Sequence, residues 1–333
     1  MGRLTRWSRW GAGALLVSVA ALNGIVWAHA RSFLYFEPPG ERTASPEALS
    51  GVERVAVLLT GVSLPRPTLS RTPGDLGLPF TTERFPTTEG ETLEAWWLPQ
   101  PGPPVGRVLV FHGYGAARDS LLEVGAWWHA RGWEVALVDC RGAGGSTGDH
   151  TTLGWKEADD VAATVAAARA RGPEPVVLYG FSMGGAAVLG ALGRLGVEAD
   201  GAVVEASYAT MSGTVANRFR LMGLPPTPLS DLLVFWGGVV AGFDGFALRP
   251  VDDAAVIRVP VLVLHGADDE RAPSTSGEAL VAALGDHGRL VVFPRTAHQP
   301  GLMTRPPEWG AAVTQLIRQV EVGGGQSRDG GAD

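Results

Sequence analysis

The sequence predicts an α/β fold with a mostly parallel central sheet, helices on both faces, a small helical cap and a preceding apolar helix. Short apolar runs alternate with helix-compatible segments between residues 80 and 320, which is typical of such sheets. Several runs are continuously apolar, as expected for strands buried on both faces. The 333 residues, 45% of them hydrophobic, suffice for one large domain of this kind or two modest ones.

The first thirty residues predict a membrane anchor. Arg3, Arg6 and Arg9 precede an apolar stretch over residues 10–30, close to the roughly 20 residues that cross a bilayer. The positive charge in front predicts an N-terminus in the cytoplasm and a body outside it. A cleaved signal peptide is the alternative, because residues 28–30 read Ala-His-Ala, and it would leave a secreted or periplasmic body. We favour the uncleaved anchor, since the apolar stretch is long for a signal-peptide core.

The segment that follows the anchor is rich in proline and glycine. It predicts an irregular arm over residues 31–79, with a short helix within 46–59. The globular body is expected over residues 80–320. Residues 321–333 are rich in glycine and polar side chains, which predicts a disordered tail.

The body opens with two strands joined by a turn, and the regular alternation follows. Strands are expected at residues 81–85, 92–98, 107–111, 134–139, 175–179, 199–205, 259–264 and 290–293. Helices are expected at residues 120–131, 157–171, 185–192, 274–284 and 307–320. Sheets of this type place their sites beyond the carboxyl ends of the strands, so reactive side chains are expected there.

One segment, residues 207–250, breaks the alternation because it is too long for a simple crossover. Its large apolar side chains favour a small helical cap over the strand ends, and an ordinary crossover helix with a long loop is the alternative. These side chains are Met211, Phe219, Met222, Leu232, Leu233, Phe235, Trp236 and Phe243.

A Gly-x-Ser-x-Gly motif centred on Ser182 stands between a buried strand and a helix of small residues. It predicts a nucleophile elbow, in which a strained corner exposes the serine and the two glycines avoid a clash. The helix directs its first N–H groups to the serine, where they favour developing negative charge. One oxyanion donor is therefore expected to be the backbone N–H of Met183.

A serine nucleophile needs a base, and the base needs an acid that orients it. His298 lies in a short loop between the last strand and the last helix, the place expected for the base. The acid is expected after the strand at 259–264, where Asp268, Asp269 and Glu270 stand together. The chain order serine, acid, histidine is the one expected for such an elbow.

Residues 80–320 together resemble a serine α/β-hydrolase. They are similar to the bacterial membrane-anchored or exported group of serine aminopeptidases and lysophospholipase-like esterases. The resemblance implies Asp269 as the acid, because Gly266 and Pro273 complete the Gly-x-x-Asp…Pro turn of the family. Asp268 is the reserve.

Two further motifs belong to the same resemblance. The His-Gly pair at residues 112–113 resembles the family's oxyanion loop and implies the backbone N–H of Tyr114 as the second donor. The run at residues 139–146 resembles a structural Asp-x-Arg-Gly-x-Gly-x-Ser turn. We expect Arg141 in this turn to pair with Asp159 or Asp160.

The function implied by the resemblance is cleavage of a carboxylic ester, with a small-molecule or lipid-like acyl substrate. Ser182 would attack, His298 would act as the base, and Asp269 would orient His298. One alternative is a serine exopeptidase or amidase, in which Glu205 or Asp231 would recognise an amine. Another is a non-catalytic binding protein of the same fold.

Composition disfavours other classes of function. The net charge of −7, without a long basic stripe in the body, disfavours nucleic acid as a partner. The sequence shows no cluster of metal ligands and no nucleotide-binding glycine pattern, so we expect no metal and no cofactor. The single cysteine, Cys140, allows no intramolecular disulfide and is expected to be buried and inert.

Overall fold

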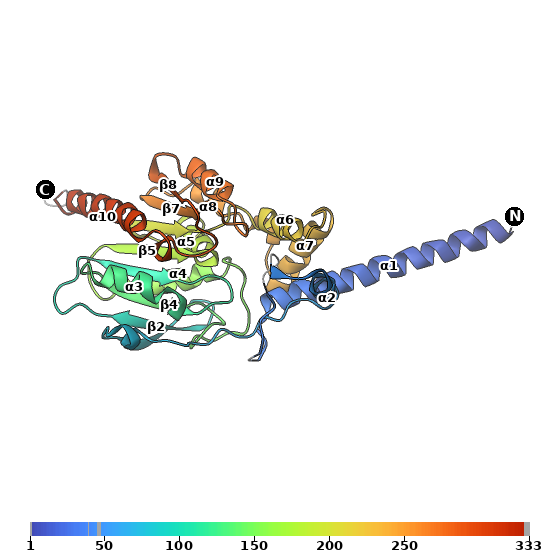
Figure 1. Cartoon of the computed structure of the whole chain (residues 1–333), viewed down its shortest axis with the longest axis horizontal. Coiled ribbons are helices and arrows are strands. Elements are labelled where there is room, and N and C mark those ends of the chain that lie inside the picture. The colour runs from blue at the N-terminus through green and yellow to red at the C-terminus, as the bar shows by residue number, and fades with distance from the viewer. Residues whose placement is uncertain (1, 39, 45–47, 330–333) are drawn as a thin grey trace.

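An eight-stranded sheet forms the centre of the computed structural model, which describes residues 2–38, 40–44 and 48–329 (Figure 1). The strand order is β1-β2-β4-β3-β5-β6-β7-β8. β2 pairs antiparallel with β1 and β4, and the pairs from β4 through β8 are parallel, which confirms the predicted fold class. The strands are β1 (Thr81–Pro86), β2 (Thr92–Leu98), β3 (Arg107–Phe111), β4 (Glu134–Asp139), β5 (Val176–Phe181), β6 (Gly201–Glu205), β7 (Val261–Gly266) and β8 (Gly288–Phe293).

The helices alternate with the parallel strands as predicted, apart from the N-terminal pair and the cap. The α-helices are α1 (Gly2–Leu34), α2 (Gly51–Thr60), α3 (Leu122–His129), α4 (Glu157–Arg169), α5 (Met183–Gly193), α6 (Met211–Leu221), α7 (Leu229–Ala241), α8 (Pro250–Ala254), α9 (Thr275–Leu284) and α10 (Pro306–Asp329). Short 3-10 turns are η2 (Pro73–Leu76), η3 (Arg118–Leu121), η4 (Gly245–Ala247), η5 (Gly285–His287) and η6 (Gly301–Met303).

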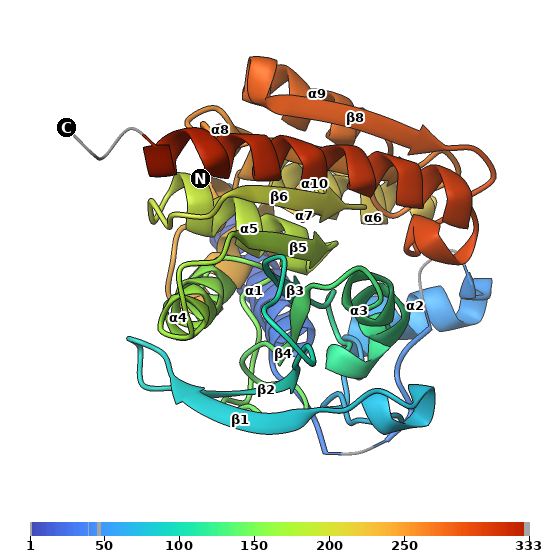
Figure 2. The same ribbon diagram turned by 90° about the vertical axis from the view of Figure 1, so that its left-hand side faces the viewer.

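Two apolar cores lie on the two faces of the sheet, because successive side chains of a strand point to opposite faces. The neighbours Trp96 and Trp97 on β2 illustrate this, since each belongs to a different core. The Trp97 side packs on α4, α5, α8 and α9. The Trp96 side packs on α3 and α10, and Figure 2 shows α10 lying across the sheet.

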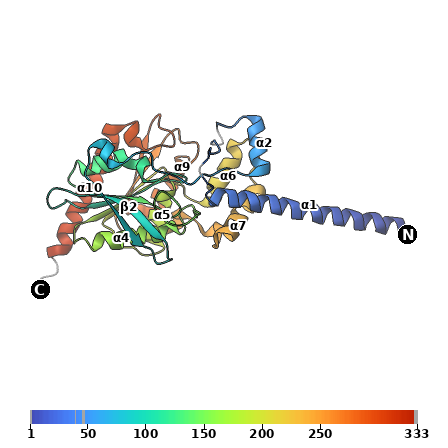
Figure 3. The ribbon, with the colours of Figure 1, turned by 90° about the horizontal axis from the view of Figure 1, so that it is seen from below.

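The N-terminal helix α1 projects from the body as a long rod (Figures 1 and 3). It continues to Leu34, four residues past the predicted boundary at Ala30, because residues 31–34 tolerate a helix and the first proline comes only at Pro38. The arm at 31–79 is therefore helical at its start. It also contains α2, which a capping box between Ser50 and Glu53 begins.

The last helix, α10, corrects the prediction of a disordered tail from residue 321. The helix continues past Val320 to Asp329, since no proline interrupts the backbone hydrogen bonds there. The remainder of the predicted tail, residues 330–333, lies outside the described residues.

The insertion between β6 and β7 forms the cap. It consists of α6, α7 and η4, which lie together at the base of α1 and away from the sheet (Figures 1 and 3). α8 then begins at Pro250 and returns the chain to the body, where Ala254 is fully buried. The helical cap replaces the alternative of a single crossover helix with a long loop.

Candidate active site

Ser182 occupies a sharp corner between β5 and α5. Its backbone has φ 52° and ψ −113°, a conformation that residues other than glycine rarely adopt. Its N–H donates to the Glu205 carbonyl at the end of β6 (2.8 Å), so the neighbouring strand holds the corner. The residue also caps the N-terminus of α5, which directs the first N–H groups of that helix to the serine side chain.

Glycine is required on both sides of this corner because backbone approaches too closely for a Cβ. A Cβ on Gly180 would collide with the Gly184 carbonyl. A Cβ on Gly184 would collide with the carbonyl of Phe111 at the end of β3. The motif is thus explained by the contact of the elbow with the neighbouring strand.

His298 and Asp269 complete a chain of hydrogen bonds behind the serine. The Ser182 hydroxyl donates to His298 Nε2 (3.1 Å), and His298 Nδ1 donates to Asp269 Oδ2 (2.8 Å). The remaining oxygen of Asp269 accepts the N–H groups of Arg271 (3.0 Å) and Ala272 (2.9 Å), and the side chain is buried. Asp269, and not its neighbour Asp268, therefore meets the histidine.

A second histidine supports the acid loop. His265, at the end of β7, is buried and donates from Nε2 to the Ala272 carbonyl (2.6 Å). Burial lowers the pKa of His265 and so favours the neutral ring, in which Nε2 carries the proton that is donated to Ala272. The ring fixes the turn that presents Asp269.

The loop after β3 brings Tyr114 to the same place. A Cβ on Gly113 would lie 3.4 Å from the Ser182 Cβ, so this loop borders the nucleophile. Met183 begins α5, and neither its N–H nor that of Tyr114 has a protein acceptor within the described part of the chain. Both N–H groups thus belong to residues beside Ser182 and are not used to hold the described part of the fold.

The side chain of Tyr114 ties this loop to the N-terminal segment, which sequence reasoning missed. Its hydroxyl donates to the carbonyl of Phe33 in the last turn of α1 (2.7 Å). Arg42 holds the next peptide by donating to the Gly115 carbonyl (2.7 Å). Burial raises the pKa of Tyr114 to about 12, so its hydroxyl stays protonated as a donor.

The chain is similar in sequence to known proteins. The family model described as "Serine aminopeptidase, S33" matches residues 102–226. Over these residues the chain is similar to that family of serine hydrolases. It is 27% identical over 229 residues to the uncharacterised protein YfhR of Escherichia coli K12, covering 66% of this chain and 74% of YfhR.

Solved structures support the α/β-hydrolase fold across the body. The Pyrococcus furiosus esterase Pf2001 superposes with a TM-score of 0.64 at 21% identity, covering 77% of this chain and 96% of the esterase. The proline iminopeptidase of Mycobacterium smegmatis superposes with a TM-score of 0.52 at 19% identity, covering 73% of this chain and 99% of that enzyme.

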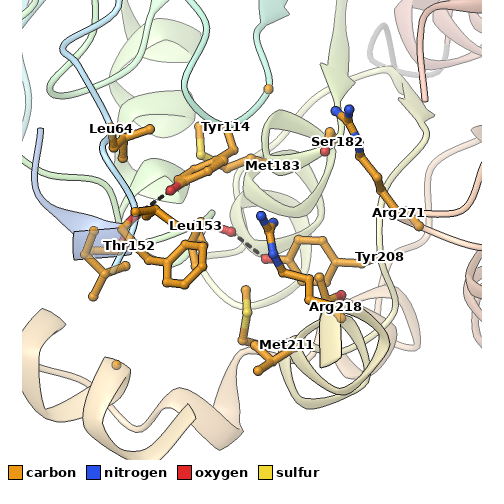
Figure 4. A pocket seen from close by; sticks show the side chains of 18 of the residues that line it. Leu64, Tyr114, Thr152, Leu153, Ser182, Met183, Tyr208, Met211, Arg218 and Arg271 are labelled. Carbon is orange, nitrogen blue, oxygen red and sulfur yellow. Dashed lines mark hydrogen bonds between the residues drawn. The ribbon is translucent and has the colours of Figure 1, made fainter. Parts of the chain in front are cut away.

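A cavity of about 630 Å³ opens in front of Ser182, a size that suits a small organic ligand. Its walls include the end of α1 and the arm, the Tyr114 loop and the cap, and the elbow and the His298 loop border it as well. Figure 4 shows Ser182 at one side and the guanidinium group of Arg271 directed toward it. The lining is mainly apolar and includes three arginines, Arg42, Arg218 and Arg271.

The described lining contains no Asp or Glu side chain. Glu205 lies in the core instead, where it accepts from Tyr179, Trp309 Nε1 and the Gly301 N–H. Asp231 is exposed at the start of α7 and is also outside the lining. Neither of these carboxylates faces the cavity in front of Ser182.

The other predicted motifs serve the fold. Arg141 pairs with Asp160 (Nη2–Oδ1 2.8 Å) in the buried turn at residues 139–146, whereas Asp159 is not its partner. Cys140 is buried, and burial raises its thiol pKa well above the usual range, so the thiol is unreactive. Within the described ranges, no group of three or more His, Cys, Asp or Glu side chains is arranged to hold a metal ion.

Proposed function

We propose that the protein is a serine hydrolase that cleaves carboxylic esters with an apolar acyl group. The observation that carries this proposal is the hydrogen-bonded series from Asp269 through His298 to Ser182, which ends in an apolar cavity. Such a series activates a hydroxyl whose own acidity is too low for it to act as a nucleophile at neutral pH.

The proposed reaction has two halves. Ser182 Oγ attacks the acyl carbonyl while His298 Nε2 takes the hydroxyl proton, and the imidazolium then gives that proton to the departing alcohol. Water attacks the acyl-enzyme in the second half, losing a proton to His298, and the acid leaves as Ser182 regains its proton. The N–H groups of Tyr114 and Met183 would hold the oxyanion in both halves, and Asp269 would stabilise the charged imidazole.

A serine exopeptidase or amidase is the second candidate. The description of the matching family model and the likeness to a proline iminopeptidase favour it. An exopeptidase that recognises a free α-amine needs an acid near the reacting carbonyl. Because Glu205 and Asp231 lie outside the lining, and the lining carries arginines, we favour the ester.

We also propose that the protein is anchored in a membrane with its catalytic body outside the cytoplasm. The segment Trp10–Leu34 of α1 is long and apolar enough to cross a bilayer, with a mean hydropathy of 1.7. Arg3, Arg6 and Arg9 precede it and favour a cytoplasmic N-terminus. We propose no oligomeric state.

The first test is covalent labelling of the full chain in detergent with a fluorophosphonate probe. We expect stoichiometric labelling of the wild type and none of Ser182→Ala, because the probe reports an activated serine. Ser8→Ala, a serine before the apolar stretch, serves as the control and should label as the wild type does. A folded wild type that stays unlabelled would support the non-catalytic alternative.

A substrate panel then separates the two enzyme candidates. Matched esters and amides of one acyl group are compared with aminoacyl derivatives that carry a free α-amine. Ester cleavage without a preference for the free amine supports the proposal. A clear preference for aminoacyl amides would favour the exopeptidase.

A further inference from the structure

The unbroken run of exposed residues in α1 is too short to cross a bilayer alone. Every residue from Trp10 to Leu22 is exposed. These 13 residues (10 through 22) rise roughly 20 Å, whereas the hydrocarbon core is about 30 Å thick. Since the arginines before Trp10 do not belong in hydrocarbon, the rest of the span must come from the residues after Leu22.

The next turns of α1 are already in contact with the cap. Asn23 accepts a hydrogen bond from Trp236 Nε1 of α7 (2.9 Å), and Val26, Ala30 and Leu34 are buried on the same face of the helix. Figures 1 and 3 both place α7 beside α1. Asn23 precedes Ala30 by seven residues, or about 10 Å along the helix axis.

If α1 crosses the bilayer with residues 10–30 in the hydrocarbon, Ala30 lies at the outer boundary and Asn23 about 10 Å inside it. Because α7 contacts α1 at Asn23, α7 then lies within the hydrocarbon or at its boundary. About 5–10 Å is the depth at which interfacial helices lie. The sequence of α7 fits such a place, because residues 232–243 carry no charged side chain and the exposed acids Asp231 and Asp244 flank them.

The outer face of the cap exposes large apolar side chains. Phe235 and Val239, four residues apart on α7, are 49% and 53% exposed, and Phe246 on η4 is 41% exposed. A row of this kind is unfavourable in water and favourable against lipid. We call Phe235, Val239 and Phe246 the outer cap face.

The opposite side of the same helix lines the cavity. Leu233, Val234 and Gly237 of α7 face the space in front of Ser182. Ala30 and Phe33 of α1 line the same space. A single layer of helices therefore separates the outer cap face from the cavity.

We propose that α7 is embedded in the leaflet nearer the body, and that the cavity receives its acyl substrate from the bilayer. The partner of the outer cap face is a lipid surface, and the substrate class is an acyl ester resident in the membrane. The second part rests on the proposed ester hydrolysis. The first part rests on the proposed membrane anchor and is independent of any reaction.

Depth-dependent quenching tests the placement without any reaction. Phe235→Cys is labelled with an environment-sensitive fluorophore in the full chain, reconstituted into vesicles with spin-labelled lipids. Val292→Cys on β8 is the matched control, because Val292 is also partly exposed but lies on the far edge strand of the sheet. Cys140 is buried, and the parent chain measures any labelling there.

We expect spin-labelled lipid, and not aqueous iodide, to quench the label at 235, with the reverse at 292. Equal iodide quenching at both positions overturns the membrane placement. If lipid quenches the label at 235 but the wild type cleaves no ester, the placement stands and the proposed function fails.

Measurements of ester cleavage test whether the substrate reaches the cavity from the bilayer. Phe235→Glu/Val239→Glu is compared with Val292→Glu on a long-chain ester in vesicles and on a soluble short-chain ester. We expect the double variant to lose about tenfold on the vesicle ester alone, because charge on the outer cap face opposes insertion. Unchanged activity on the vesicle ester, or an equal loss on both substrates, overturns the proposal.

Discussion

Ser182 illustrates how one strained residue can be located from sequence. The glycines two positions before and after it are required by contact with Phe111 and with the elbow itself, so the motif carries a steric requirement that is visible in the chain. His298 can be located from the sequence in the same way, because a loop between the last strand and the last helix lies at the carboxyl edge of the sheet. Asp269 was not separable from Asp268 by physical reasoning and depended on the family resemblance.

Glu205 shows where residue-level reasoning from sequence stops. It was a candidate for amine recognition because it ends a strand near the elbow. The structure instead turns its carboxylate into the core, where Trp309 and Gly301 donate to it. Nothing in the sequence pattern gives the direction of that side chain.

The buried carboxyl of Glu205 predicts a pH dependence of stability. Burial raises its pKa above the ordinary 4.5, so the unfolded chain releases this proton first. The wild type should therefore lose free energy of unfolding relative to Glu205→Gln as the pH rises above 4.5, by about 1.4 kcal/mol per pH unit until the folded pKa is reached. Urea unfolding at a series of pH values measures the difference.

Glu278→Gln, an exposed change on α9, is the control for this series and should leave the wild-type profile unaltered. A wild type that instead gains stability over Glu205→Gln as the pH rises would mean that the donors around the carboxyl outweigh its burial.

The elements of the body followed from their apolar runs, whereas the contacts between elements did not. The bond between Tyr114 and the last turn of α1 joins residues 81 positions apart through a backbone carbonyl, which has no sequence signature. The end of α1 was also misplaced. The predicted boundary lies at residue 30, where the apolar stretch ends, but a helix ends where its backbone bonds end.

The link between α1 and the Tyr114 loop predicts a loss of rate in Tyr114→Phe. This change removes the hydroxyl that donates to Phe33 and keeps the ring, so the loop loses its tether at a cost of about 1 kcal/mol. We expect kcat to fall more than KM rises, because the Tyr114 N–H would act on the transition state.

Tyr208→Phe provides the matched comparison, since the Tyr208 hydroxyl also donates to a backbone carbonyl, that of Leu153. Both variants should lose similar stability in thermal unfolding. An equal fall in kcat for the two would show that the Tyr114 tether has no special part in the reaction.

At the scale of the whole molecule, the anchor, arm, cap and body share one cavity. Sequence reasoning predicted each of these parts but treated them as separate, because apolar patterns describe single segments. The association of α1 with the cap depends on tertiary packing of residues more than 200 positions apart, such as Asn23 and Trp236.

This organisation predicts that residues 1–30 are retained in the mature protein. Cleavage after Ala30 would remove Asn23, Val26 and Ala30, leaving Trp236 without its acceptor and the cavity without part of its wall. We expect the intact mass of protein extracted from membranes to include these residues.

A chain that lacks residues 1–30 should lose about tenfold or more in ester cleavage in detergent, because loosened packing of this kind costs several kcal/mol. A chain that lacks only residues 1–9 should keep its activity. Full activity of the chain that lacks residues 1–30 would show that this part of α1 is not needed for ester cleavage.

The contact between Asn23 and Trp236 fixes the position of the cap, and with it the body, along the axis of α1. On the proposed placement, it also fixes the distance of Ser182 from the bilayer. The enzyme would then select esters by the distance of their carbonyl from the membrane surface, and not only by the chemistry of their acyl chains. Moving that contact by one helical turn would change which lipids are cleaved without altering any residue beside Ser182.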